Sequence, residues 1–116
     1  MLFICYPKCS TCAKAKKWLA ANNISYEERD IKINNPKYTE ISQWYKASNL
    51  PLKAFFNTSG IPYRELGLKS KLVDMEESDQ LKLLATNGML VKRPLLIGEN
   101  FVLVGFKEAE WREALL

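Results

Sequence analysis

The sequence predicts an α/β domain in which helices cover the faces of one four-stranded mixed sheet. Three observations carry this prediction. Residues 2–33 show a strand-helix-strand pattern, residues 95–115 show a strand-strand-helix pattern, and the segment between them has helical spacing. Strand, helix and strand in this order form a right-handed unit with parallel strands, whereas two closely spaced strands form an antiparallel hairpin.

The first unit is predicted to contain a strand at 2–6, a helix at about 10–22 and a strand at 24–33. The run from Leu2 to Tyr6 is continuously apolar, which is typical of a buried strand, and we expect its Cys5 in the core. The helix is predicted from apolar residues at helical spacing, namely Cys12, Ala15, Trp18 and Leu19. The second strand is predicted from apolar residues that stand between charged ones, namely Ile24, Tyr26, Ile31 and Ile33.

The middle of the chain, about residues 37–90, is expected to be a helical insertion. Asn34-Asn35-Pro36 is typical of a turn. Helices are predicted after it at about 38–48, 52–57 and 77–87, with Gly88 as the C-terminal stop of the last one.

The last quarter of the chain returns to strands. Strands are predicted at 95–97 and 101–104, joined by Gly98-Glu99-Asn100. A closing helix is expected at about 107–115, with Trp111, Ala114 and Leu115 facing inward. The order β-α-β, helical insertion, β-β-α is that of a thioredoxin-like domain.

Length and composition predict one domain over residues 1–116, because 47% hydrophobic residues are sufficient for a single core. No apolar run approaches the roughly 18 residues of a membrane span, and the N-terminus lacks a signal-peptide core. We therefore expect a cytoplasmic protein without membrane contact. The net charge of +4 is modest and basic residues mostly alternate with acidic ones, so direct nucleic-acid binding is not expected.

The clearest chemical feature is the Cys-x-x-Cys at Cys9 and Cys12, located between the first strand and the first helix. Free N–H groups and the dipole of a helix start favour a thiolate, and two thiols at this spacing can form a disulfide. We interpret Cys9, nearer the helix N-cap, as the nucleophile and Cys12 as the resolving thiol of a redox-active pair. Lys8 and the lysines that follow should favour the thiolate and attract acidic thiols such as glutathione.

Two other interpretations of the cysteines stay open. A zinc site needs four ligands, usually from two paired knuckles, whereas this chain has three cysteines within eight residues and no histidine. The cysteines could also be ordinary buried residues. We expect no metal and no bound cofactor.

Arg93-Pro94 opens the third predicted strand. Proline cannot donate a ladder hydrogen bond and therefore suits a strand start, where a cis peptide bond persists only when its surroundings hold it. In the thioredoxin fold this proline lies beside the cysteine pair. Arg93 would then lie near the Cys9 sulfur and stabilise a thiolate or bind an oxyanion, although it could also be a solvated arginine at a strand end.

Three segments together resemble the ArsC/Spx family, which contains glutaredoxin-dependent arsenate reductases and Spx/MgsR-type regulators. The segments are residues 6–14 (YPKCSTCAK), 55–68 (FFNTSG and YRELGL) and 88–95 (GMLVKRPL), and the resemblance extends over essentially the whole chain. It implies a catalytic cysteine at Cys9 and an arsenate-binding arginine at Arg93. At the places of two further family arginines this chain has Asn57 and Val104-Gly105-Phe106.

Three functions are consistent with these features. The first is a thiol-disulfide redox protein that cycles Cys9 and Cys12 and is reduced by glutathione, glutaredoxin or thioredoxin. The second, implied by the resemblance, is an Spx-like regulator that binds the RNA polymerase α subunit. The third, also implied by it, is a glutaredoxin-dependent arsenate reductase.

Overall fold

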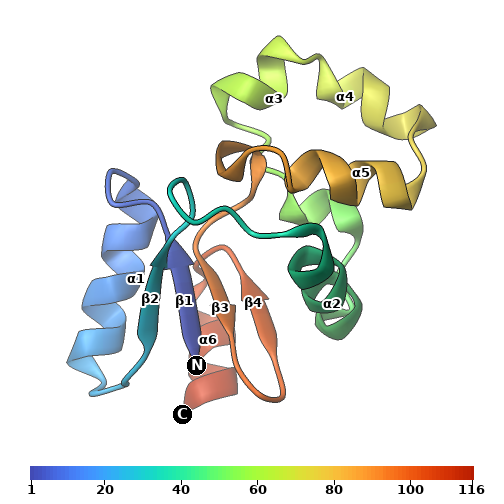
Figure 1. The fold of residues 1–116 in the computed structure, drawn as a ribbon. Coiled ribbons are helices and arrows are strands. Elements are labelled where there is room, and N and C mark those ends of the chain that lie inside the picture. The colour runs from blue at the N-terminus through green and yellow to red at the C-terminus, as the bar shows by residue number, and fades with distance from the viewer.

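The computed structural model describes residues 1–116 and contains one four-stranded sheet (Figure 1). Its strands are β1 (Leu2–Cys5), β2 (Glu27–Asp30), β3 (Leu95–Ile97) and β4 (Val102–Val104), in the spatial order β2-β1-β3-β4. β1 pairs in parallel with β2 and antiparallel with β3, and β3 pairs antiparallel with β4. The mixed sheet predicted from the sequence is confirmed.

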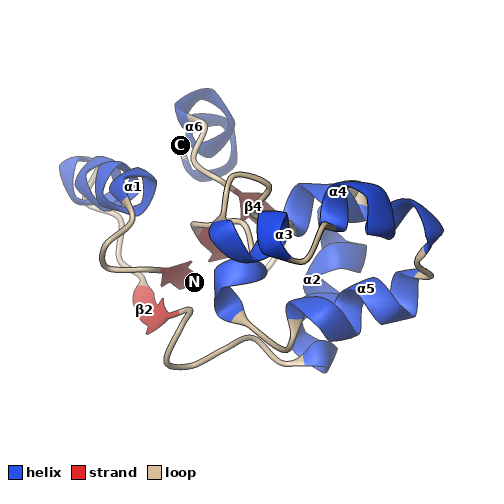
Figure 2. Cartoon of the chain, turned by 90° about the horizontal axis from the view of Figure 1, so that it is seen from above, coloured by secondary structure: helices blue, strands red, loops and turns tan.

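Helices lie on both faces of this sheet (Figure 2). α1 (Ser10–Ala21) and α6 (Glu108–Leu115) cover one face, and α2 (Tyr38–Ser48) and the rest of the helical insertion lie on the other. The insertion contains η1 (Leu52–Phe55), α3 (Ile61–Glu65), α4 (Leu68–Lys71), η2 (Leu72–Asp74), α5 (Glu77–Leu84) and η3 (Gly88–Leu90). None of the helices combines the length and the apolar composition that a membrane span requires.

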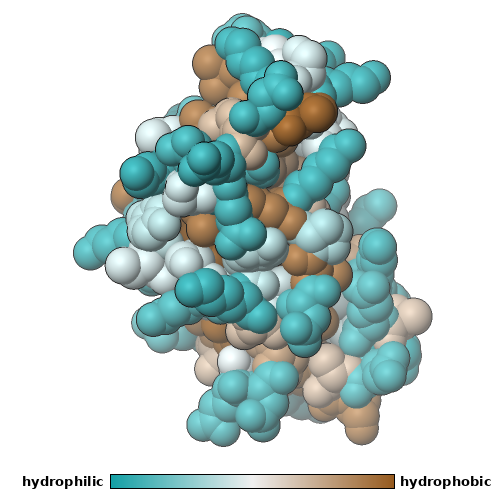
Figure 3. Space-filling view, turned by 90° about the vertical axis from the view of Figure 1, so that its right-hand side faces the viewer, coloured by the Kyte–Doolittle hydropathy of each residue, from teal (hydrophilic) through white to brown (hydrophobic).

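Two apolar clusters fill the space on either side of the sheet. Successive strand residues face opposite sides, so Phe3 and Cys5 join the smaller cluster under α1 and α6, whereas Ile4 joins the larger one under the insertion. Trp111 is fully buried in the smaller cluster, and its Nε1 donates a hydrogen bond to the carbonyl of Gly105 at 3.1 Å. On the side that carries α2, hydrophilic side chains separate the apolar surface into small patches (Figure 3).

The second strand is shorter than the predicted 24–33. Asp30 ends it, because its carboxylate accepts hydrogen bonds from the N–H groups of Lys32 at 2.8 Å and Ile33 at 3.1 Å and turns the chain. Ile31 is buried as predicted, but Ile33 is 86% exposed. Ala114 of the closing helix is also exposed, contrary to the prediction, since the buried face of α6 consists mainly of Trp111.

The prediction that Gly88 stops the helix at 77–87 was wrong. α5 ends at Leu84, and Gly88 begins η3 instead. Gly88 is buried against the segment that follows β2, where a Cβ atom would collide with the main-chain oxygen of Ile31. The glycine is therefore required by the close approach of two backbone segments and not by a left-handed helix cap.

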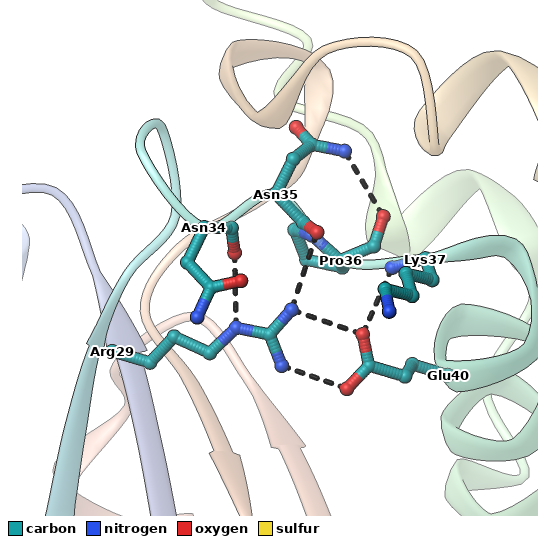
Figure 4. A network of polar contacts seen from close by, with 6 residues as sticks. All are labelled: Arg29, Asn34, Asn35, Pro36, Lys37 and Glu40. Atoms are coloured by element: carbon teal, nitrogen blue, oxygen red, sulfur yellow. Dashed lines mark hydrogen bonds and ion pairs between the residues drawn. The ribbon is translucent and has the colours of Figure 1, made fainter.

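A polar network fixes the connection from β2 to α2 (Figure 4). The guanidinium of Arg29 binds both carboxylate oxygens of Glu40 at 2.7 and 2.9 Å and donates to the carbonyls of Asn34 at 2.9 Å and Asn35 at 3.2 Å. Glu40 also accepts the N–H of Lys37 at 2.9 Å, which caps α2. The hydrogen bonds of Arg29 hold the pKa of Glu40 below its usual range.

Glu40→Gln is expected to destabilise the protein by about 1–2 kcal/mol near pH 7, because it removes a bidentate ion pair and weakens a cap. The folded-state pKa of Glu40 is lowered, so its contribution exists above the unfolded-state pKa of about 4.3 and is lost as the pH falls further. Urea unfolding of parent and variant between pH 3 and pH 7 measures the difference. A difference that stays constant down to pH 3 would contradict this assignment.

Candidate functional site

Cys9 stands at the N-cap of α1, directly after the turn that leaves β1. Its N–H donates to the carbonyl of Tyr6 at 2.9 Å, and its own carbonyl accepts the N–H of Ala13 at 3.1 Å as the first bond of the helix. Its backbone is extended, with φ −87° and ψ 122°, as an N-cap residue requires. The side chain is half-buried, so the sulfur is accessible at the start of the helix.

The surroundings of Cys9 favour its thiolate. Burial alone would raise its pKa, but the N–H of Cys12, the Cys12 side chain, the N–H of Thr11 and the charge of Arg93 outweigh burial. The net effect lowers the pKa of Cys9 below the ordinary value of a cysteine. Cys9 therefore has the properties of an attacking thiolate.

Cys12 differs from Cys9 in burial and in the direction of its pKa shift. It is 1% exposed, and burial is the main reason that its pKa rises to about 12, although the N–H of Tyr6, 3.4 Å from its sulfur, opposes this. A negative charge on Cys9 raises it further. Cys5 is buried as predicted, and its pKa is also raised, chiefly by burial. All three cysteines are free thiols.

The charge of Arg93 is one of the smaller effects that lower the pKa of Cys9, and the role of Arg93 at the thiolate stays a prediction. The peptide bond to the buried Pro94 is cis, and the Pro94 carbonyl accepts the N–H of Gly105 at 2.8 Å. The Arg93 guanidinium lies over the ring of Tyr6, 5.5 Å from its centroid. Its Nε and one Nη are buried without a hydrogen-bond partner in the protein, which leaves donors free for an anion.

Arg93→Ala is expected to raise the pKa of Cys9 and to slow its alkylation at neutral pH severalfold, because a cation beside the thiolate is lost. Arg93→Lys should recover much of the rate, since it restores the charge but not the planar fork. Iodoacetamide alkylation as a function of pH, in a Cys12→Ser background, measures both effects. Parent-like pH profiles for both variants would remove Arg93 from the site.

A cavity of about 470 Å³ opens at Thr11, which lies between Cys9 and Cys12 in the sequence, although neither cysteine lines it. Thr11, from the first turn of α1, forms part of its wall. The segment around Asn57, through Phe56 and Thr58, and the segment 104–106 also line it. The fold thus brings together the start of α1 and the two places where the family resemblance implied arginines.

Three residues at this cavity were missed by sequence reasoning: Lys53, Lys92 and Lys107. Lys92 is adjacent to Arg93 in the sequence, which could have indicated it. Lys53 and Lys107 belong to distant segments that only the fold brings together. Lys8, in contrast, is exposed and is not a main contributor to the pKa of Cys9, so its supporting role stays a prediction. No three side chains of the metal-binding types converge in the structure.

The fold and the thiols at the helix start define a thioredoxin-like α/β protein with a cysteine pair. The chain belongs to the ArsC family, whose model matches residues 5–114. It is 50% identical to the uncharacterized protein YusI of Bacillus subtilis over 97% of this chain and 96% of that protein. It is 28% identical to the global transcriptional regulator Spx 2 of Lactococcus lactis, over 94% of this chain and 81% of the regulator.

The chain is also similar to a solved structure. A crystal structure described as that of an ArsC family related protein from Bacteroides fragilis superposes with a TM-score of 0.95. The two sequences are 59% identical, and the match covers 97% of this chain and 94% of the other. This similarity confirms the thioredoxin-like fold predicted from the order of elements.

Proposed function

We propose that this protein is a thiol-disulfide oxidoreductase that uses Cys9 and Cys12. The observation that carries the proposal is the opposite behaviour of two neighbouring thiols: the pKa of Cys9 is lowered, and that of Cys12 is raised to about 12. One thiol is thus prepared to attack while the other stays protonated until it is needed.

In the first step, the Cys9 thiolate attacks one sulfur of a substrate disulfide. A bond forms between Cys9 and that sulfur, the substrate S–S bond breaks, and the second substrate sulfur leaves as a thiolate. The charge on Cys9 disappears in this step. Since that charge helps to raise the pKa of Cys12, its loss makes the Cys12 thiol more acidic.

In the second step, Cys12 loses its proton to solvent and attacks the Cys9 sulfur. The mixed disulfide breaks, the remaining substrate sulfur leaves as a thiolate, and a Cys9–Cys12 disulfide forms. The substrate disulfide has then gained two electrons and the protein has lost two. An external dithiol or two monothiols, of the glutathione, glutaredoxin or thioredoxin class, would restore the protein.

The test is reduction of a small disulfide, bis(2-hydroxyethyl) disulfide, with glutathione, glutaredoxin or thioredoxin supplied in turn as reductant. Arsenate replaces the disulfide in a parallel assay. Disulfide turnover without arsenate turnover supports the proposal. Arsenate turnover that exceeds disulfide turnover would instead favour the reductase, although Arg93 alone stands where the family resemblance implies three arginines.

A second candidate is a redox-dependent regulator that binds the RNA polymerase α subunit. The similarity to Spx 2 of Lactococcus lactis, over 94% of this chain, supports it. In this case the Cys9–Cys12 disulfide would set the binding state instead of completing a catalytic cycle. Binding of the purified α subunit to the oxidised and reduced protein distinguishes the two, because an enzyme without this role would bind in neither state.

A further inference from the structure

The outer edge of β4 offers unpaired main-chain groups. β4 is the last strand of the sheet. The hydrogen bonds at the two ends of the β3–β4 ladder show which of its residue pairs are hydrogen-bonded. The N–H of Gly98 donates to Phe101, and the N–H of Gly105 donates to Pro94. Antiparallel pairs alternate between bonded and non-bonded, so the N–H and C=O groups of Val102 and Val104 point away from β3.

A groove runs along this edge from Thr11, in the first turn of α1, to α6. Besides the cavity at Thr11, a second cavity of about 440 Å³ is lined by all three residues of β4 and by Glu110 and Glu113 of α6. The two cavities share the lining residues Ala54, Val104 and Lys107, so they adjoin each other and together make a depression beside β4. We call it the β4 groove.

The end of the β4 groove at Thr11 is strongly cationic. Lys53, Lys92 and Lys107 line it, and no acidic residue does. None of the three lysines takes part in an ion pair, since the ion pairs of the molecule are Lys16–Glu28, Arg29–Glu40 and Glu108–Arg112. The far end, by contrast, carries the two carboxylates of α6. Three uncompensated cations in one depression favour a ligand with negative charge at this end.

We propose that the β4 groove binds an extended polypeptide segment of a partner protein by strand addition, with acidic residues beside the cysteine that meets Cys9. The inference rests on the proposed function for the presence of that cysteine. Main-chain bonds to Val102 and Val104 would supply the pairing, and the three lysines would select the acidic residues. A small acidic thiol would occupy only the lysine end and would leave the strand edge unused.

The test uses fluorescent nonapeptides in which the central cysteine is replaced by serine, so that binding is measured without redox chemistry. One peptide carries aspartates beside the serine, and its matched control carries lysines there. Fluorescence anisotropy at low salt should show the acidic peptide binding at least about tenfold more tightly than the basic one. Equal affinities would overturn the proposal.

Two further arms examine the lysines and the strand edge. Lys107→Glu should weaken binding of the acidic peptide by about tenfold. The matched change Lys82→Glu should not, because Lys82 is an exposed residue of α5 that does not line the groove. Peptides N-methylated at alternate residues test pairing without altering the protein, because only one of the two alternating sets of N–H groups faces β4. Loss of binding from one set alone supports strand addition, and equal effects of both sets contradict it.

The outcomes separate this inference from the proposed function. If the protein reduces bis(2-hydroxyethyl) disulfide but neither peptide binds, the redox function stands and the docking proposal fails. If the acidic peptide binds but no disulfide is reduced, the docking surface stands without the enzyme. A dimer that forms in sedimentation experiments and is abolished by Lys107→Glu would assign the edge to a second copy of this chain and overturn the proposal.

Discussion

Replacing Cys9 by serine is expected to lower the rate of disulfide reduction by about a thousandfold or more. A serine hydroxyl does not ionise at neutral pH, so the N–H groups of Thr11 and Cys12 and the charge of Arg93 would have no anion to stabilise. The reduction of bis(2-hydroxyethyl) disulfide measures the effect. Folding should change little, because Cys9 is half-buried and contributes less to the core than Cys12 does.

The matched control is Cys5→Ala, which removes the buried thiol that contacts Cys12 but leaves both Cys9 and Cys12 in place. We expect it to retain activity per folded molecule. Cys12→Ser should stop the cycle after the first step and accumulate a mixed disulfide on Cys9, detectable by mass spectrometry. If the Cys9→Ser variant is active, or if it accumulates a mixed disulfide on Cys12, the roles of the two cysteines are reversed.

Gly88→Ala is expected to destabilise the fold by about 3 kcal/mol or more, a large part of the roughly 5–15 kcal/mol that stabilises a typical domain. A Cβ atom at this position would collide with the carbonyl oxygen of Ile31 and lie 2.9 Å from the Asn35 side chain. The obstacle is main chain, which cannot move aside as a side-chain tip would. Asn35 in turn donates to the carbonyl of Ala85 at 2.8 Å, so the segment after β2 is held at this spot.

Gly67→Ala provides a graded comparison for Gly88→Ala. Gly67 has a left-handed φ of 63°, but a Cβ there would meet only the Lys71 side chain, at a comfortable 3.9 Å, so alanine should cost only about 1 kcal/mol. Urea unfolding followed by circular dichroism gives both values. Equal losses for the two variants would show that conformational freedom, and not the backbone contact at Ile31, explains Gly88.

The strongest local patterns predicted their elements well. The regular spacing of apolar residues predicted the bounds of α1 and α2 nearly to the residue, and the apolar run at 2–6 predicted β1. This works because the residues that an element buries recur with the period of that element. The second strand was predicted too long, since the side chain of Asp30 turns the chain before the apolar alternation ends. The alternation of apolar and polar residues gives no sign of these hydrogen bonds of Asp30.

The site was only partly predictable for a related reason. Cys9, Cys12 and the cis Arg93-Pro94 bond follow from short-range chemistry and family resemblance, and the structure places Arg93 close enough to lower the pKa of Cys9. Lys53 and Lys107 belong to the same cavity but come from η1 and the residue before α6. Nothing in their local sequence distinguishes them from other surface lysines, and their meeting depends on the packing of the insertion against the sheet.

The proposed function requires Cys12 to form a disulfide with Cys9. In the structure, Cys5 competes with Cys9 for the Cys12 sulfur. The Cys12 side chain also lies within contact of the buried Cys5, so two disulfides compete for the same sulfur. Mild oxidation of the native protein with one equivalent of diamide, followed by proteolysis and peptide mapping, decides between them. We expect a Cys9–Cys12 bridge with Cys5 left as a free thiol, because the lowered pKa of Cys9 favours it as the thiolate that begins the exchange. A Cys5–Cys12 bridge with Cys9 free would contradict it.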